Sequence, residues 1–144
     1  MSQKVEIEFA ASPSSEVLDA LSKGLTDHSL GHVEKPGFSS VAWFHRDPEG
    51  NIDAGINGFL NWNWANVYNF WVAEPLRGQG VGKQLLSAFE EHAIAHGCDH
   101  IHLDTFTFQA PDLYEAWGYE QFATLENYPE GHARHFYRKK LCRT

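Results

Sequence analysis

The segment with the most chemical information is the run from Val72 to Lys83, VAEPLRGQGVGK. It lies between a run of β-branched and aromatic residues and a stretch with helical spacing. Glycines at 78, 80 and 82 allow the backbone to turn sharply and to approach a ligand without Cβ clashes. The first N–H groups of a following helix are unpaired, and the helix dipole favours an anion there. The segment therefore predicts a cradle for a phosphate or pyrophosphate group.

The spacing of this segment excludes two common phosphate-binding loops. A Walker A loop needs glycine five positions before the Gly-Lys pair and Ser or Thr after it, but Arg77 and Gln84 stand there. A dinucleotide fingerprint counted from Gly78 needs glycine where Lys83 stands. The pattern that remains is Arg-x-x-Gly-x-Gly, from Arg77 to Gly82.

The hydrophobic pattern predicts the elements that must position this loop. A half-buried strand is expected over residues 5–9, and a helix with one apolar face follows and ends near Gly24. Turn residues then separate three expected strands between residues 39 and 73. The remaining expected elements are a helix over 81–97, a strand near 101–105, a short helix over 111–117, and strands over 119–125 and 134–141. This order predicts an α/β fold with a mixed sheet whose middle strands are joined by a crossover helix.

Length and charge limit the class of protein. A chain of 144 residues is expected to form a single domain, residues 1–144. The net charge of −8 argues against a nucleic-acid partner and is compatible with a cationic, amine-bearing substrate. No apolar run approaches the ~20 residues of a membrane span, so no membrane partner is expected. The charged N-terminus and the unpatterned Cys98 and Cys142 predict a cytoplasmic protein without a signal peptide.

Two motifs together resemble a known family. The Arg77–Gly82 pattern is similar to the motif with which GCN5-related N-acetyltransferases bind the pyrophosphate of acetyl-coenzyme A, and APDLYEAWGY at 110–119 is similar to a second motif of that family. The resemblance implies a mainly antiparallel mixed sheet of order β-αα-βββ-α-β-α-ββ with a parallel central strand pair. It also implies transfer of an acetyl group from acetyl-coenzyme A, the co-substrate, to a primary amine of a small molecule by direct attack in a ternary complex.

The same resemblance assigns roles to residues of the cofactor site. The loop from Arg77 through Gly78, Gln79, Gly80, Val81 and Gly82 to Lys83 would hold the pyrophosphate. Backbone groups of Trp71, Val72 and Ala73 would bind along the cofactor, and those near Trp71 and Val72 would polarise the thioester carbonyl. Tyr114 would donate a proton to the departing thiolate. The family often has Asn three residues before the alanine of the second motif; here Thr107 stands there, and Gln109 is the substitute expected to contact the cofactor.

The acceptor side is less defined by the sequence. Family members often carry a basic carboxylate on the strand that precedes the glycine loop, but residues 67–72 have none, so Asp104 on the next strand is the expected general base. The resemblance places the acceptor between residues 26–38, the neighbouring strands and the loop from Asn127 to His132. Glu34, Tyr68 and Asp104 are therefore the expected substrate-binding residues.

Other interpretations stay open at this point. His100, His102 and Asp104 alternate on one strand face, but their spread of ~13 Å is too large for one ion, so no metal is expected. A catalytically weak acyl-coenzyme A-binding regulatory module would keep the same cradle. Homodimers are common in the resembled family and are compatible with the chain.

Overall fold

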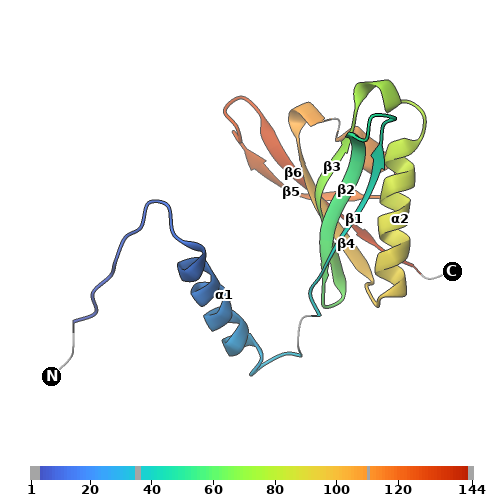
Figure 1. The fold of residues 1–144 in the computed structure, drawn as a ribbon. Coiled ribbons are helices and arrows are strands. Elements are labelled where there is room, and N and C mark those ends of the chain that lie inside the picture. The colour runs from blue at the N-terminus through green and yellow to red at the C-terminus, as the bar shows by residue number, and fades with distance from the viewer. Residues whose placement is uncertain (1–3, 35–36, 110, 143–144) are drawn as a thin grey trace. The chain divides into compact units, whose positions relative to one another are not determined.

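The computed structural model of the protein describes residues 4–34, 37–109 and 111–142 (Figure 1). The chain divides into two compact units, Met1–Lys35 and Pro36–Thr144. They are described in turn.

The N-terminal unit contains one helix, α1 (Ser15–Ser29). The Ser14 hydroxyl caps it by accepting a hydrogen bond from the Val17 N–H at 3.3 Å. The helix continues through Gly24, which the sequence predicted as its end, because a single glycine in a helix costs only about 1 kcal/mol. No residue of α1 is buried within the unit.

The strand expected over residues 5–9 is not formed, and this prediction was wrong. Val5, Ile7 and Phe9 are 78%, 87% and 90% exposed, and the segment has no regular structure. Alternation supplies the side-chain pattern of a strand, but a strand also needs a neighbour for its backbone N–H and C=O groups. The described residues between α1 and residue 39 contain no second helix either. The expected β-αα start is therefore reduced to one helix.

The larger unit is built on a six-stranded sheet in the order β1-β2-β3-β4-β6-β5. All neighbouring strands are antiparallel except β3 and β4, which are parallel and joined through α2. This confirms the predicted mixed sheet with its parallel central pair. Its elements are β1 (Ser39–Arg46), β2 (Ile52–Asn61), β3 (Trp64–Val72), η1 (Glu74–Leu76), α2 (Val81–Ala95), β4 (His100–Phe106), η2 (Thr107–Gln109), α3 (Asp112–Ala116), β5 (Glu120–Glu126) and β6 (Ala133–Lys140).

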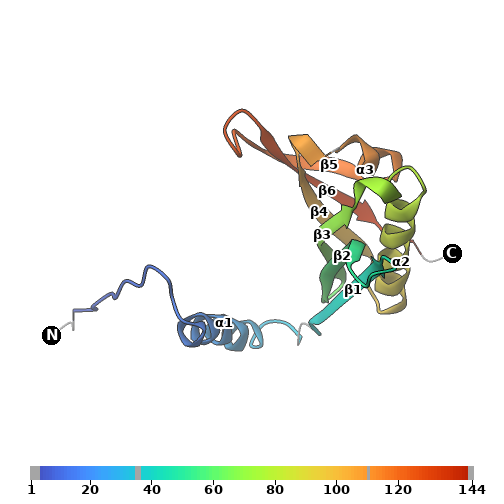
Figure 2. The same cartoon turned by 45° about the horizontal axis from the view of Figure 1, so that its top comes forward.

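The core lies between the sheet and α2, and α3 stands beside α2 (Figure 2). Phe89 and Leu86 of α2 pack against Ile101 and Leu103 of β4, and all four are at most 2% exposed. Burying side chains of this size stabilises the fold by about 1.5–3 kcal/mol each. No helix in the described part of the chain is long and apolar enough to cross a bilayer.

A β-bulge in β3 shapes the centre of the sheet. Asn57 pairs with Asn69, but the next residue of β2, Gly58, pairs with Val67, so Tyr68 is an extra residue in β3. The Asn57 side-chain oxygen accepts a hydrogen bond from the Asn69 N–H at 3.0 Å, which occupies a backbone donor at the irregularity. A bulge bends its strand and increases the local twist.

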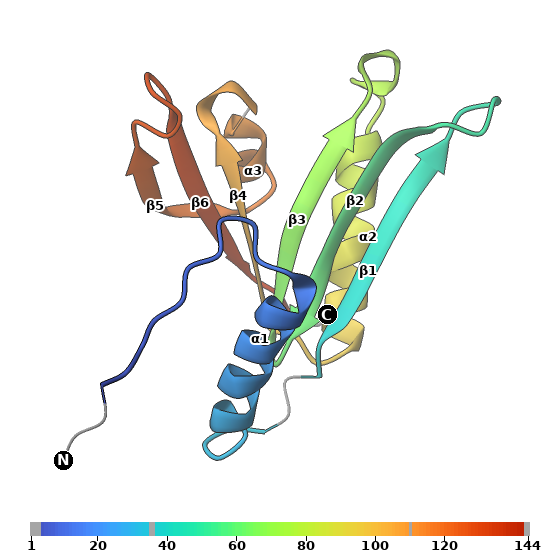
Figure 3. The same cartoon turned by 60° about the vertical axis from the view of Figure 1, so that its left-hand side comes forward.

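Strands β3 and β4 separate just before this bulge. Their parallel pairing covers only Trp64–Asn66 with His100–His102, although β3 continues to Val72 and β4 to Phe106. Beyond Asn66 the backbones of the two strands diverge (Figure 3), and we call the region between these diverging backbones the opening. The backbone edges that face this opening have no ladder partner in the other strand.

Gly58 allows the close approach of β2 to β3 at the bulge. A Cβ atom added at this position would clash with the Asn66 carbonyl oxygen and lie 2.9 Å from Cε2 of the buried Phe89. Backbone and a fully buried ring are the neighbours least able to move. The glycine is therefore required by packing, and its φ is not the reason.

We expect Gly58→Ala to destabilise the larger unit by about 3 kcal/mol, the upper end of the range for overpacking. Chemical denaturation followed by tryptophan fluorescence measures the change. Gly82→Ala is the matched control, because the nearest atom to its added Cβ is Phe70 Cζ at an ordinary 3.5 Å. Equal stability of the two variants would contradict this account of the bulge.

Candidate functional site: an anion cradle beside a divided sheet

The glycine loop connects the end of β3 to α2. Gly78 and Gly80 have φ angles of 77° and 79°, a region that side chains with a Cβ rarely adopt. The first hydrogen bond inside α2 runs from the Gln84 N–H to the Gly80 carbonyl at 3.0 Å. The N–H groups of residues 81–83 precede that bond, so they are donors available at the positive end of the helix dipole. This arrangement confirms the strand, glycine turn and helix N-terminus that the sequence predicted.

Two side chains of the loop hold its own backbone. The Arg77 Nε donates to the Val72 carbonyl at 2.9 Å, and the Gln79 amide donates to the Pro75 carbonyl at 2.9 Å. An added Cβ on Gly78 or Gly80 would have no protein atom within 4 Å. Hydrogen bonds from its own side chains to its backbone thus stabilise the loop, and the space above the two glycines is open. A cradle of this form suits an anion bound by backbone donors.

The backbone of β3 presents particular N–H groups to the opening. The Ala73 N–H donates to the Asp53 carbonyl of β2 at 2.8 Å, and Trp71 pairs with Gly55 in the same ladder. Because backbone groups alternate along a strand, the N–H groups of Phe70 and Val72 point away from β2, towards the side of β4. The Trp71 N–H, which we expected to polarise the thioester carbonyl, is therefore directed to β2 instead, as is the Ala73 N–H.

Tyr114 of α3 lies in an aromatic cluster beside the opening. Its ring contacts four aromatic rings at centroid distances of 5.8–6.4 Å, those of Phe70, Trp117, Tyr119 and Tyr137. Its hydroxyl has no hydrogen-bond partner among the described residues. Burial and the charge of Asp104 raise the pKa of Tyr114 to about 12. At neutral pH the hydroxyl is therefore a protonated donor that the protein leaves unused.

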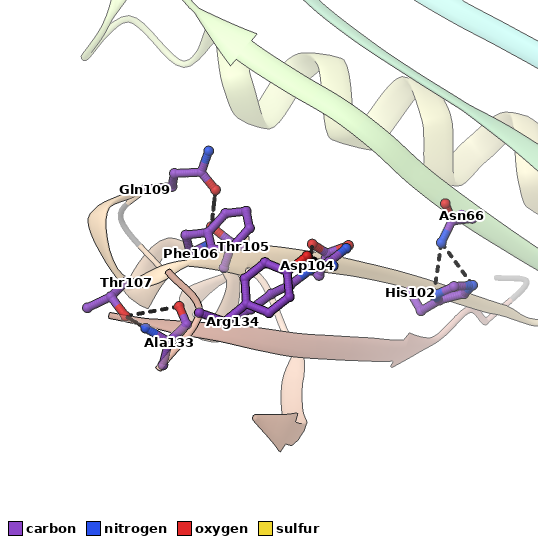
Figure 4. A network of polar contacts seen from close by, with 10 residues as sticks. Asn66, His102, Asp104, Thr105, Phe106, Thr107, Gln109, Ala133 and Arg134 are labelled. Atoms are coloured by element: carbon purple, nitrogen blue, oxygen red, sulfur yellow. Dashed lines mark hydrogen bonds and ion pairs between the residues drawn. The ribbon is translucent and has the colours of Figure 1, made fainter. Parts of the chain in front are cut away.

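Asp104 lies on β4 and forms an ion pair with β6 that the sequence did not indicate. The Arg134 Nε donates to Asp104 Oδ2 at 2.6 Å (Figure 4). The guanidinium lies 5.2–5.6 Å from the ring centres of Phe106, Tyr128 and Phe136. Asp104 raises the pKa of Arg134, so the guanidinium stays charged. No spacing in the sequence brings residues 104 and 134 together; antiparallel pairing of β4 with β6 does.

The two candidates for the family asparagine have different partners. The Thr107 hydroxyl donates to the Ala133 carbonyl at 3.1 Å and accepts from its N–H at 2.9 Å, so it is used within the fold. The Gln109 Oε1 accepts from the Phe106 N–H at 2.9 Å. Its Nε2 group has no hydrogen-bond partner in the described part of the chain, and it points away from β4 in Figure 4. Gln109 is thus the residue of the two with a free donor.

The other expected site residues are spread over the surface. Tyr68, the bulge residue, is 73% exposed. Lys83 lines a cavity of about 210 Å³ between α2 and α3, together with Ser87 and Trp117. Glu34 belongs to the N-terminal unit, which is described separately. Among the described residues no three His, Cys, Asp or Glu side chains come close enough together to hold a metal ion.

Comparison with known proteins identifies the family. Residues 14–119 match the sequence profile of the Acetyltransferase (GNAT) family. The chain belongs to this family. It is an acetyltransferase that uses acetyl-coenzyme A. The site fits a pyrophosphate for two reasons. The N–H groups of residues 81–83 supply backbone donors, and the open space above Gly78 and Gly80 leaves room for the anion.

Relatives of this acetyltransferase cover much of its length. It is 34% identical over 93 residues to the blasticidin-S acetyltransferase of Streptomyces morookaense. The aligned region is 64% of this chain and 68% of the relative. It is 27% identical over 110 residues to the thialysine N-epsilon-acetyltransferase of Bos taurus, 64% of this chain and 65% of the relative. A crystal structure of an acetyltransferase from Bacillus cereus aligns with a TM-score of 0.82 at 28% identity, and covers 93% of this chain and 98% of that one.

We expect Gly80→Val to weaken acetyl-coenzyme A binding at least tenfold, about 1.4 kcal/mol. Valine strongly disfavours the positive φ of this position, so the loop must change shape where the pyrophosphate is held. Because an added Cβ here has no protein atom within 4 Å, the core is unaffected and the variant stays folded. Titration calorimetry measures the affinity. A folded variant with unchanged affinity would show that the loop does not bind the cofactor.

Proposed function

We propose that this enzyme transfers the acetyl group of acetyl-coenzyme A to a primary amine of a small molecule, by direct attack of the amine in a ternary complex. The observation that carries the proposal is the opening between β3 and β4. The glycine cradle lies at the end of β3 beside this opening. The Tyr114 hydroxyl borders the opening from α3, and the Asp104 carboxylate borders it from β4. Two substrates held side by side in such an opening gain a large rate advantage, about 7–11 kcal/mol for well-oriented groups.

Amine acceptors are supported by the chain's charge and by its relatives. The net charge of −8 favours the approach of cationic molecules. One relative is named for acetylation of the antibiotic blasticidin S, and another for N-epsilon-acetylation of thialysine, which is a small amine. We therefore propose small amine-bearing molecules as the acceptor class. Asp104 and Tyr68 are the side chains of the larger unit that we propose to contact the acceptor.

The residues proposed to hold acetyl-coenzyme A follow from the geometry of the loop and strand edge. When bound, the cofactor supplies an acetyl thioester. The N–H groups of residues 81–83 bind its pyrophosphate, with Lys83 beside them. The Val72 and Phe70 N–H groups face the opening and are placed to donate to the thioester carbonyl, so Phe70 replaces Trp71 in this role. The Gln109 Nε2 group is the further donor proposed from η2.

Tyr114 is proposed to assist departure of the thiolate. Its pKa of about 12 lies roughly 3.5 units above that of a free thiol, so full proton transfer to the sulfur is uphill. A hydrogen bond from the hydroxyl to the developing thiolate is favourable without such a transfer. The four aromatic rings around Tyr114 pack against its ring and fix the ring's position.

We expect Tyr114→Phe to lower kcat by about 10²-fold while acetyl-coenzyme A affinity stays unchanged. The substitution keeps the aromatic packing and removes only the unpartnered hydroxyl. Steady-state kinetics and calorimetry on the same preparation measure the two quantities. Tyr119→Phe is the control for loss of a tyrosine hydroxyl elsewhere in the cluster, where the hydroxyl binds Glu90 at 2.6 Å. A Tyr114→Phe kcat within a factor of two of wild type would assign Tyr114 to packing alone.

The acceptor class is tested with a panel of small molecules and a thiol-release assay. We expect coenzyme A release with some primary amines and none with the matching alcohols, because a neutral amine is the stronger nucleophile. Mass spectrometry of the product should show one added acetyl group on nitrogen. Binding of acetyl-coenzyme A without turnover on any amine would favour the alternative of a regulatory acyl-coenzyme A-binding module.

A further inference from the structure

His102 occupies the point where the sheet divides. It pairs with Asn66 in the last register position shared by β3 and β4. The residues that alternate with it, Ile101 and Leu103, are buried against the core, so His102 projects from the face opposite α2. Asp104 follows on the same face, two residues further along the opening. The imidazole is half-buried at the closed end of the opening that we propose holds the thioester and the amine.

Asn66 holds the imidazole ring from the neighbouring strand. Its Nδ2 lies 2.9 Å from His102 Nδ1 and 3.0 Å from Nε2, as Figure 4 shows. A neutral imidazole has one donor and one acceptor nitrogen, so this amide can serve only one of them at a time. Rotation of the amide by 180° brings Oδ1 to the same point, where it accepts the ring N–H. The other ring nitrogen is then unprotonated and can act as an acceptor.

The surroundings keep this ring neutral. Burial lowers the pKa of His102, and the charge of Asp104 opposes that shift without reversing it. From β3 the ring meets Trp64, edge-on at 5.6 Å between centroids, and Asn66, neither of which is charged. Arg138 of β6 stands opposite it and binds Glu120 at 2.8 Å. His100 precedes it on the same strand face, with Lys140 opposite His100 in the β6 register.

Asp104 has a partner that the sequence did not indicate. Its Oδ2 accepts a hydrogen bond from the Arg134 guanidinium at 2.6 Å, so this carboxylate is already engaged within the fold. The neutral imidazole of His102 has no such ion pair with any described residue.

We propose that His102 accepts the proton that the amine nitrogen loses as it attacks the thioester carbonyl. The inference rests on the proposed amine acetylation. The amine nitrogen forms the C–N bond and becomes strongly acidic, and its proton moves to the free ring nitrogen of His102. The C–S bond then breaks, the thiolate leaves with a hydrogen bond from Tyr114, and it is finally protonated to free coenzyme A. The imidazolium returns its proton to solvent, so no other reactant is needed.

The experiment compares kcat as a function of pH for wild type and three variants, with a saturating amine from the panel above. Protonation of the His102 ring blocks the base, and the pKa of this ring is lowered. Wild-type kcat should therefore fall as the pH drops below about 6.5, and this fall is the acidic limb of the pH profile. We expect His102→Gln to lower kcat at neutral pH by about 10²-fold and to remove this acidic limb. Acetyl-coenzyme A affinity, measured by calorimetry, should stay within twofold and show that the variant is folded.

Two matched variants separate a base from a structural residue. His100→Gln changes a histidine on the same strand face where β3 and β4 are still paired, and should keep both kcat and the acidic limb. Asp104→Asn should lower kcat/KM for the amine but keep the limb. A His102→Gln enzyme with wild-type kcat, or a limb lost in Asp104→Asn and kept in His102→Gln, would overturn the assignment. Absence of amine acetylation by wild type would instead overturn the proposed function on which it rests.

Discussion

The separation of β3 from β4 is the constraint on which the site depends. A regular parallel sheet would satisfy the backbone donors of β3 with carbonyl groups of β4 and leave none for a ligand. The extra residue Tyr68, opposite Asn57 and Gly58, bends β3 so that pairing ends at Asn66 and His102. The same bend directs the carboxyl end of β3 towards the glycine loop. One inserted residue therefore creates both the opening and its donors.

Packing around the bulge makes this irregularity stable. Gly58 lets the Asn66 carbonyl and the Phe89 ring approach closely, and the Asn57 side chain binds the backbone N–H at the bulge. Phe89 is fully buried in α2, the same helix whose N-terminus forms the anion cradle. The position of the cradle relative to the opening is thus fixed by the core. A site built on such rigid elements requires little ordering when its ligands bind.

The local parts of the fold were predictable from sequence, and the contacts between distant segments were not. The glycine loop and the helix after it are encoded by neighbouring residues, and both were predicted correctly. The strand over residues 5–9 was wrong, because alternation says nothing about whether a partner strand is present. The Tyr68 bulge follows from a two-strand register, which a single sequence does not display.

The candidate site shows the same division. Tyr114 was found through its motif, and its unpartnered hydroxyl agrees with the proposed role. The ion pair of Asp104 with Arg134 was not found, because the strand over residues 134–141 was predicted but its antiparallel pairing with β4 was not. The partner of His102 was missed as well, since residues 66 and 102 meet only through the parallel pairing of β3 with β4.

The distribution of protons in the opening follows from these contacts. Tyr114 keeps its proton because burial and the nearby carboxylate oppose the phenolate, and Arg134 holds the Asp104 carboxylate in an ion pair at 2.6 Å. Burial lowers the pKa of His102 and thereby favours the neutral imidazole. A donor, a fixed charge and a base therefore stand around one opening. Asp104 links the other two groups, because its charge helps to raise the pKa of Tyr114 and opposes the lowering of the His102 pKa by burial.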